Sequence, residues 1–151
     1  MAEQTTSSIE IKATPGEVMG VIADFAAYPQ WAQGVKSAVV VEQGEPGRAK
    51  QVAFELEQKP ISDAYTLSYV WDGDDSVVWT LVEGKTLKAL DGSYTLQATP
   101  SGTEVTYRLS VDIAIPMIGM LRRKAEKVII DSALKGLKKR LWRDPVPPRK
   151  L

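Results

Sequence analysis

The side chains of this sequence that could do chemistry are mainly tyrosines and tryptophans set in apolar stretches. Residues 65–71 read YTLSYVW, and Trp79, Tyr94 and Tyr107 follow in later stretches of the same kind. A phenol hydroxyl or an indole N–H presents one polar group on an otherwise apolar ring. Such residues, gathered on one surface, favour the binding of a small hydrophobic molecule through a few hydrogen bonds.

The residues that most enzymes use for acid–base and nucleophilic catalysis are missing. The chain has no His and no Cys, which excludes Ser-His and thiolate nucleophiles and metal sites built on His or Cys. No acidic cluster has the spacing of a calcium loop. We therefore expect no metal, no cofactor and no catalytic residue, and a binding protein rather than an enzyme.

The elements that must position these aromatic residues follow from hydrophobic periodicity. Alternation bounded by turn residues predicts strands at 7–13, 35–43, 50–59, 63–72, 76–83, 93–100 and 103–115. Thr14, Pro15 and Glu17 mark the start of a helix over 15–25, and apolar residues at helical spacing predict a long helix over 117–143. This order predicts an α+β fold, with an antiparallel sheet of about seven strands curved over the last helix and one or two short helices after the first strand.

Alternation also assigns the two faces of the sheet. Polar residues such as Glu55, Thr66 and Thr80 are expected to face solvent, which turns the opposite parity toward the helix. The residues expected on the inner face are Val52, Phe54, Leu56, Tyr65, Leu67, Tyr69, Trp71, Val77, Trp79, Leu81, Tyr94, Leu96, Val105, Tyr107, Leu109, Val111 and Ile113. By this parity no Asp, Glu, Lys or Arg points inward. Parity is inconsistent between 84 and 92, so we expect a bulge or bend near Asp91-Gly92.

The helix offers small residues opposite these large rings. Ala125, Ser132, Ala133 and Gly136 lie beside larger apolar residues on the inner side of the predicted helix 117–143. Small residues against large ones indicate either close interdigitation or a cavity that the rings line. If a cavity exists, Ala125→Trp or Gly136→Leu should fill it at little cost in stability.

The break between the first helix and the next strand is unusually aromatic. Residues 24–34 carry Phe25, Tyr28 and Trp31, whereas ordinary connectors are polar. From the residues alone, these side chains either plug one end of the core or line the mouth of a cavity.

Three features resemble the polyketide cyclase/dehydrase and lipid-transport family of the START-like, helix-grip superfamily. They are DFAAYPQWAQGVKSAVVVE (24–42) after the TPGEVMGVI helix, the YxLxYxW strand at 65–71 and the long final helix. The resemblance covers about residues 6–143 and implies one START-like domain over 1–143, with a cavity between sheet and final helix. It implies an entrance near Tyr28 and Trp31. The residues then expected to line the cavity are Phe54, Tyr65, Tyr69, Trp71, Trp79, Tyr94, Tyr107, Leu121, Ala125, Val128 and Ser132.

Three classes of function fit these observations. The first is a carrier, sensor or chaperone of a small hydrophobic ligand such as a lipid, an isoprenoid quinone or a polyketide-like aromatic. The second is a polyketide aromatase/cyclase or dehydratase that positions its substrate and hydrogen-bonds a developing enolate through Tyr hydroxyls. The third is an interaction protein that uses its outer face or its basic end.

The C-terminal part of the chain is strongly basic. Residues 117–151 contain eleven Lys and Arg but only three acidic residues. Leu134, Leu137 and Leu141 recur at helical spacing among Lys135, Lys138, Lys139, Arg140 and Arg143, and Trp142 follows. This pattern is typical of a surface helix on anionic lipid and predicts weak membrane contact, whereas nucleic acid is not expected.

The remaining expectations concern the state of the chain. Residues 144–151 read as a disordered tail. Without an apolar run of about eighteen residues or a signal peptide, we expect a cytoplasmic protein. We also expect a monomer or weak dimer.

Overall fold

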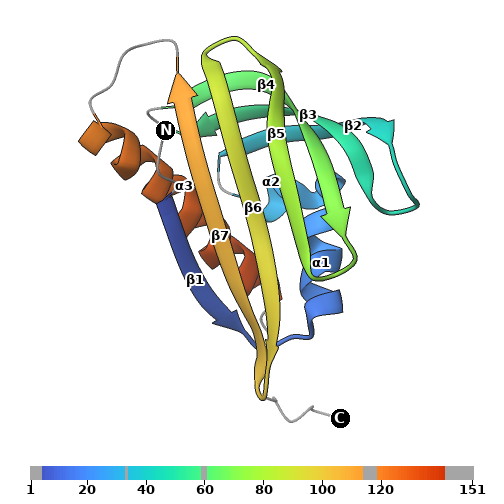
Figure 1. Cartoon of the computed structure of the whole chain (residues 1–151). Helices are drawn as coiled ribbons and strands as arrows, with labels where there is room; N and C mark the ends of the chain where they lie inside the picture. The colour runs from blue at the N-terminus through green and yellow to red at the C-terminus, as the bar shows by residue number, and fades with distance from the viewer. Residues whose placement is uncertain (1–4, 33, 59–60, 114–118, 142–151) are drawn as a thin grey trace.

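One antiparallel sheet curves around the C-terminal helix in the computed structural model (Figure 1). The structure describes residues 5–32, 34–58, 61–113 and 119–141. Its elements are β1 (Thr5–Ile11), α1 (Pro15–Ala23), the 3-10 helix η1 (Phe25–Ala27), α2 (Tyr28–Trp31), β2 (Val35–Gln43), β3 (Ala49–Gln58), β4 (Ile61–Asp72), β5 (Ser76–Gly84), β6 (Leu87–Thr99), β7 (Gly102–Ile113) and α3 (Gly119–Arg140). The predicted α+β helix-grip fold is confirmed, including short helices after the first strand.

Helix α1 begins where the sequence predicts. Thr14 accepts a hydrogen bond from the backbone N–H of Glu17 at 3.1 Å, and the Glu17 carboxylate accepts one from the Thr14 N–H at 2.9 Å. This reciprocal capping box satisfies two N–H groups that a helix start otherwise leaves free. Val18, Met19 and Ile22 then face the core, fully buried.

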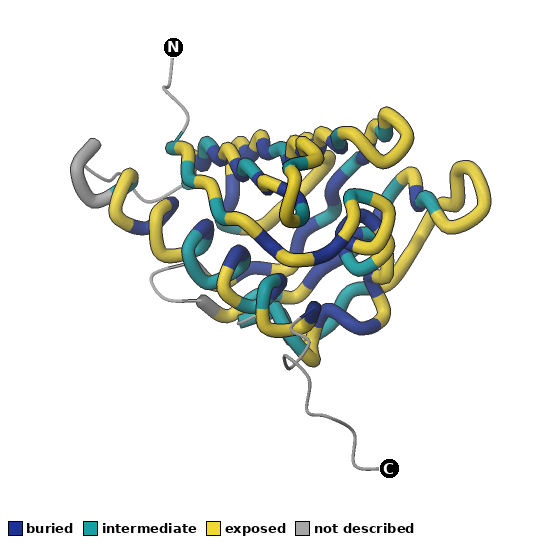
Figure 2. The backbone as a smooth tube through the Cα atoms, turned by 90° about the horizontal axis from the view of Figure 1, so that it is seen from below, coloured by how far each residue is buried: buried dark blue, intermediate teal, exposed yellow. Residues whose placement is uncertain are grey.

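The strand order is β1-β7-β6-β5-β4-β3-β2, so β2 to β7 form successive hairpins and β1 joins the end of the series. Thr5 pairs with Leu109, and Ile11 pairs with Thr103. Helix α3 lies across the β1 and β7 side of the concave face (Figure 1). Helix α2 contacts β2, and α1 contacts α3, β6 and β7. Seen from below, buried residues occur along both the strands and the helices that enclose the interior (Figure 2).

The predicted faces of the sheet are confirmed. Residues of the inner set are buried or half-buried along β3 to β7, and those of the outer set, such as Glu55 and Thr80, are exposed or half-exposed. Figure 2 shows the same alternation as bands of buried and exposed backbone. Tyr69 and Trp79 pair directly across β4 and β5 and are both buried, which places the aromatic rings on one face.

The irregularity in β6 lies earlier than the sequence predicts. Strand β6 begins at Leu87, and its register against β7 shifts between Leu87 and Ala89, not near Asp91-Gly92. The shift brings both Leu87 and Leu90 to the buried face. Glycine at position 92 is explained by close packing and not by a bulge, because a Cβ there would lie 2.3 Å from Nε1 of Trp79. The indole of Trp79 lies over the bare backbone of its neighbouring strand.

The prediction that no acidic side chain points inward is wrong at Asp63. This residue shares the parity of Tyr65 and is 9% exposed. Its carboxylate accepts hydrogen bonds from the backbone N–H groups of Lys85, Thr86 and Leu87, at 2.9 to 3.1 Å. These donors lie at the turn between β5 and β6. The Asp63 carboxylate takes the place of the backbone carbonyls that would accept their hydrogen bonds in a sheet.

Glu126 is a second buried acid, on α3, and is 1% exposed. Its carboxylate accepts hydrogen bonds from the Thr5 hydroxyl at 2.6 Å and from the Val111 backbone N–H at 2.7 Å. Val111 lies two residues beyond Leu109, which pairs with Thr5 at the start of β1. The carboxylate therefore bonds the β7 backbone next to this pair and ties α3 to both strands.

Candidate functional site

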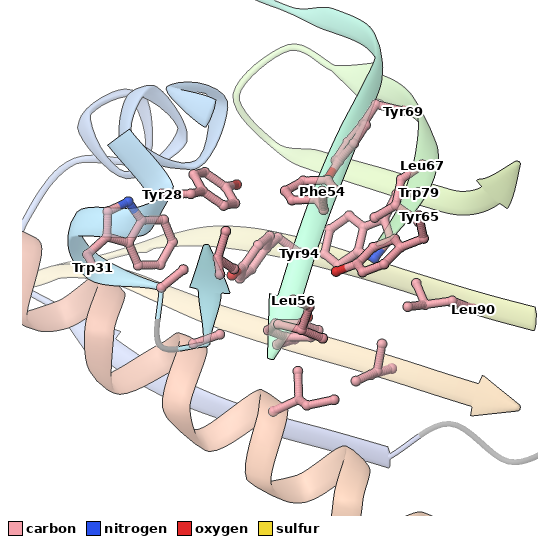
Figure 3. A pocket seen from close by; sticks show the side chains of 16 residues that line it. Tyr28, Trp31, Phe54, Leu56, Tyr65, Leu67, Tyr69, Trp79, Leu90 and Tyr94 are labelled. Atoms are coloured by element: carbon pink, nitrogen blue, oxygen red, sulfur yellow. The ribbon is translucent and has the colours of Figure 1, made fainter. Parts of the chain in front are cut away.

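A pocket of about 100 Å³ lies between the aromatic face of the sheet, α2 and α3 (Figure 3). Its lining consists of Tyr28, Trp31, Ala32, Val35, Phe54, Leu56, Tyr65, Leu67, Tyr69, Trp79, Leu90, Tyr94, Tyr107, Leu109, Ile129 and Ala133. All five tyrosines of the chain are in this set, and no Asp, Glu, Lys or Arg is. The sheet and α3 thus leave a small hollow between them, lined by the aromatic residues.

The aromatic lining forms two groups of ring contacts, which Phe25 behind the pocket joins through its contacts with Tyr28, Phe54 and Tyr69. Tyr94 and Tyr107 have ring centroids 4.7 Å apart, and each also contacts Trp79. Phe54 stacks on Tyr65 at 5.5 Å. Such contacts fix the orientation of each ring, so the wall of the pocket is preorganised on the strands and does not depend on loops.

Four of the five tyrosine hydroxyls in the pocket have no hydrogen-bond partner in the part of the chain that the structure describes. Among the described residues, the hydroxyls of Tyr65, Tyr69, Tyr94 and Tyr107 make no hydrogen bond to another group. Burial raises the pKa of all four above the ordinary phenol value, and neighbouring tyrosines add to the shift for Tyr65, Tyr69 and Tyr94. They therefore stay protonated at neutral pH and act as donors rather than bases.

The aromatic break forms η1 and α2 and closes one end of the pocket. Tyr28 is buried, and its hydroxyl donates to the Ile22 carbonyl at the end of α1. Trp31 packs on Tyr28 with ring centroids 4.8 Å apart. Its indole N–H is buried without an acceptor among the described residues, which costs about 1–3 kcal/mol. Both predicted entrance residues thus line the pocket, while their role as an entrance stays a prediction.

The structure brings together six of the predicted lining residues from the sheet: Phe54, Tyr65, Tyr69, Trp79, Tyr94 and Tyr107. Trp71 is not among the lining residues. Its indole N–H donates to the Ala49 carbonyl at 2.8 Å, and the Arg48 guanidinium lies 5.2 Å from its ring centroid. Trp71 therefore covers the outer end of the aromatic layer. Ligand contact by any of these residues stays a prediction.

The helix contributes different residues from those predicted. Ile129 and Ala133 line the pocket, whereas Ala125 is buried away from it and Val128 is 39% exposed. Ser132 lines an outer groove, and the side chain of Leu121 lies outside the described residues. Of the small residues that the sequence indicated, Ala133 lines the pocket, whereas Ser132 and Gly136 line the outer groove.

Gly136 is a contact point for α2 and does not face the pocket. A Cβ at this position would lie 2.3 Å from the Trp31 carbonyl oxygen. The proposed cavity-filling change Gly136→Leu is therefore wrong in its geometry, because the added side chain would displace α2. Ala133 is the position from which a larger side chain would enter the pocket.

The leucines of the basic end are not available to a membrane. Leu134, Leu137 and Leu141 are 3%, 0% and 8% exposed because they pack under the sheet, while Trp142 and Arg143 lie outside the described residues. Contact with anionic lipid stays a prediction that rests on the basic side chains alone. None of the described helices is long and apolar enough to span a bilayer, and the tail at 144–151 falls outside the described residues.

The tyrosine hydroxyls without a partner and the hydrogen-bonded hydroxyl of Tyr28 should differ in their contribution to stability. We expect Tyr107→Phe to change the free energy of unfolding by less than about 0.5 kcal/mol, because its hydroxyl has no protein partner to lose. Tyr28→Phe should cost about 1–2 kcal/mol, because it leaves the Ile22 carbonyl unpaired. Urea unfolding of both variants measures the difference, and equal losses would contradict the hydrogen-bond pattern described here.

The sequence profile of the family described as polyketide cyclase / dehydrase and lipid transport matches residues 2–142. No curated protein sequence matches the chain. Among solved structures, a START superfamily protein from Mycobacterium smegmatis is similar with a TM-score of 0.85 and 19% identity, covering 93% of this chain and 97% of that one.

Two further structures share the fold. The Zhui aromatase/cyclase from Streptomyces sp. R1128 has a TM-score of 0.71 at 11% identity, with 92% of this chain and 93% of that one covered. A major latex-like protein from Panax ginseng has a TM-score of 0.70 at 15% identity, with 93% and 98% covered. At these identities the likeness concerns the fold alone. The profile match, however, spans nearly all of the sequence, and this protein belongs to the polyketide cyclase/dehydrase and lipid-transport family.

Proposed function

We propose that this protein binds a small hydrophobic molecule, such as a lipid, an isoprenoid quinone or a polyketide-like aromatic, in the pocket between the sheet and α3. The observation that carries the proposal is an apolar, uncharged wall that contains four tyrosine hydroxyls without hydrogen-bond partners among the described residues. These tyrosines line the pocket, so their hydroxyls can donate hydrogen bonds to a molecule bound there. A ligand with a carbonyl or hydroxyl oxygen beside an apolar body satisfies both parts of this wall.

The size of the pocket limits the form of the ligand that the described conformation accepts. A volume of about 100 Å³ is below the roughly 300–1,000 Å³ of most small-molecule sites. The ligand therefore enters after a movement of the wall. The rings on β3 to β7 are held by the sheet, so the short segment η1–α2 is the part of the wall best able to move.

The alternative is an aromatase/cyclase or dehydratase. The observation in its favour is the pair Tyr94 and Tyr107, whose rings meet at 4.7 Å and whose hydroxyls stay protonated. Such donors could stabilise an enolate oxygen. The pocket lining contains no group that titrates near neutral pH to remove the proton. Proton abstraction would have to come from the substrate or from water, so binding without turnover is the better supported function.

The direct test is the identity of what the protein carries. We expect organic extracts of protein purified without detergent to contain one apolar class of molecule that mass spectrometry detects, and the same class to be absent from extracts of an unrelated protein prepared in parallel. A second measurement uses the neutral fluorescent probe N-phenyl-1-naphthylamine, which should bind with one site per chain and be displaced by the extracted molecule. Absence of both signals would contradict the proposed function.

A further inference from the structure

A second hollow adjoins the pocket on the outside of the molecule. It is an open groove of about 480 Å³ between α2 and α3, lined by Trp31, Val128, Asp131, Ser132, Lys135, Gly136 and Lys139. Trp31 is the one residue that lines both hollows. The indole therefore separates an uncharged interior from a charged exterior groove.

The two faces of α3 that meet at this point differ in chemistry. Ile129 and Ala133 face the pocket, and the groove begins at the adjoining positions Val128 and Ser132. One turn further along, Lys135 and Lys139 line the groove, are exposed, and make no ion pair among the described residues. A molecule that reaches from pocket to groove therefore passes from apolar walls to two ammonium groups.

The acidic member of the groove does not cancel these charges. Asp131 is bound by Lys127 at 2.9 Å, one helical turn before it. Farther along α3, the Arg140 guanidinium donates to the Gln30 side chain at 2.9 Å and so joins α3 to α2. The groove thus retains a net positive charge that comes from Lys135 and Lys139.

Trp31 is placed so that it can separate or connect the two spaces. Its side chain is half-buried and its indole N–H has no acceptor among the described residues, so the closed position is penalised by one unpaired donor. The four-residue helix α2 meets α3 at bare Gly136, where the Trp31 carbonyl approaches the helix. Rotation of the indole would expose its N–H to water and connect the pocket with the groove.

We propose that the ligand of this protein is an amphipathic carboxylate, whose apolar chain occupies the pocket and whose carboxylate lies in the groove between Lys135 and Lys139, with Trp31 as the gate between them. The inference rests on the proposed function and adds to it the charge and orientation of the ligand. Lysine ammonium groups attract a carboxylate without a fixed geometry, which suits a headgroup at an open, hydrated rim.

The test compares two probe molecules that have carbon chains of the same length and differ in the headgroup. Binding of decanoate and of 1-decanol to the full-length protein is measured by calorimetry at pH 7.5. The carboxylate of decanoate is ionised at this pH. The variant Lys135→Gln/Lys139→Gln should bind decanoate about tenfold more weakly than the wild type, since two partly exposed ion pairs are lost. Binding of 1-decanol should change by less than about twofold, and the preference for decanoate should shrink in high salt.

A matched control separates local from general charge. Arg123→Gln/Lys124→Gln removes the same charge from exposed positions of α3 outside the groove and should leave decanoate binding unchanged. If both probes bind and the groove variant equals the wild type, or if the control weakens decanoate equally, the inference is wrong and the proposed function stands. If neither probe binds the wild type, the proposed function fails and the inference fails with it.

Discussion

Ala133→Phe should weaken ligand binding about 100-fold while the protein stays folded. Ala133 lies on α3 and lines the pocket opposite the aromatic wall, so a phenyl ring there would occupy the space that a ligand needs. Loss of roughly 110 Å² of ligand burial at about 25 cal/mol/Å² corresponds to about a 100-fold weaker affinity. Fluorescence titration with N-phenyl-1-naphthylamine measures the loss, and thermal unfolding shows whether the fold is kept.

The control for this variant adds the same ring elsewhere. Ala98→Phe places a phenyl group at an exposed position of β6 that does not line the pocket, and it should bind the probe like the wild type. A ring that does not fit at Ala133 would cost about 1–3 kcal/mol of stability through overpacking. Unchanged binding by Ala133→Phe would show that the probe binds outside the pocket, and would contradict the assignment of the site.

Asp63→Ala should be among the most destabilising single changes in the chain. The carboxylate accepts hydrogen bonds from four backbone N–H groups, those of Ala64, Lys85, Thr86 and Leu87. A Cβ at Gly84 would lie 2.9 Å from the Asp63 Oδ2, so the turn closes tightly around this side chain. We expect a loss of about 3 kcal/mol, since bonds to a charged acceptor are lost and the Leu87 donor is buried. This corresponds to a fall of about 6–12 °C in Tm.

Two control variants make this stability prediction specific. Asp63→Asn keeps one acceptor oxygen and should lose less than the alanine variant. Asp91→Ala removes an exposed carboxylate from β6 and should change stability by less than about 0.5 kcal/mol. If Asp63→Ala proved as mild as Asp91→Ala, the carboxylate would not be what holds the β5–β6 turn.

The features of this fold that depend on local rules could be predicted from the sequence. Period-two alternation placed β2, β5 and the faces of the strands, because a residue and its second neighbour must share a face. The Thr14, Pro15 and Glu17 signals placed the start of α1, because capping involves residues three apart. The pocket wall on β3 to β7 followed from the same alternation.

The errors occur where the deciding partner is distant in sequence. Asp63 is inward because its hydrogen-bond donors at 85–87 need an acceptor, and no pattern around residue 63 shows this. The inward side of α3 also includes Glu126, whose carboxylate accepts hydrogen bonds from Thr5 and Val111. In the sequence Glu126 reads as one more surface charge of a basic helix. Trp71 has inward parity, but its indole bonds the Ala49 carbonyl at the end of the layer.

The pairing of β1 with β7 has a consequence for how the chain acquires its structure. Thr5 meets Leu109, the Thr103 hydroxyl donates to the Ala13 carbonyl, and Glu126 bonds Thr5. Contacts of such long sequence separation must wait for most of the chain, which places this topology among slow folders. During synthesis, β1 leaves the ribosome before β7 and remains without this partner until β7 emerges. From that moment until β1 pairs with it, the edge of β7 is open to pairing with other chains, so fast addition of β1 protects the protein from aggregation.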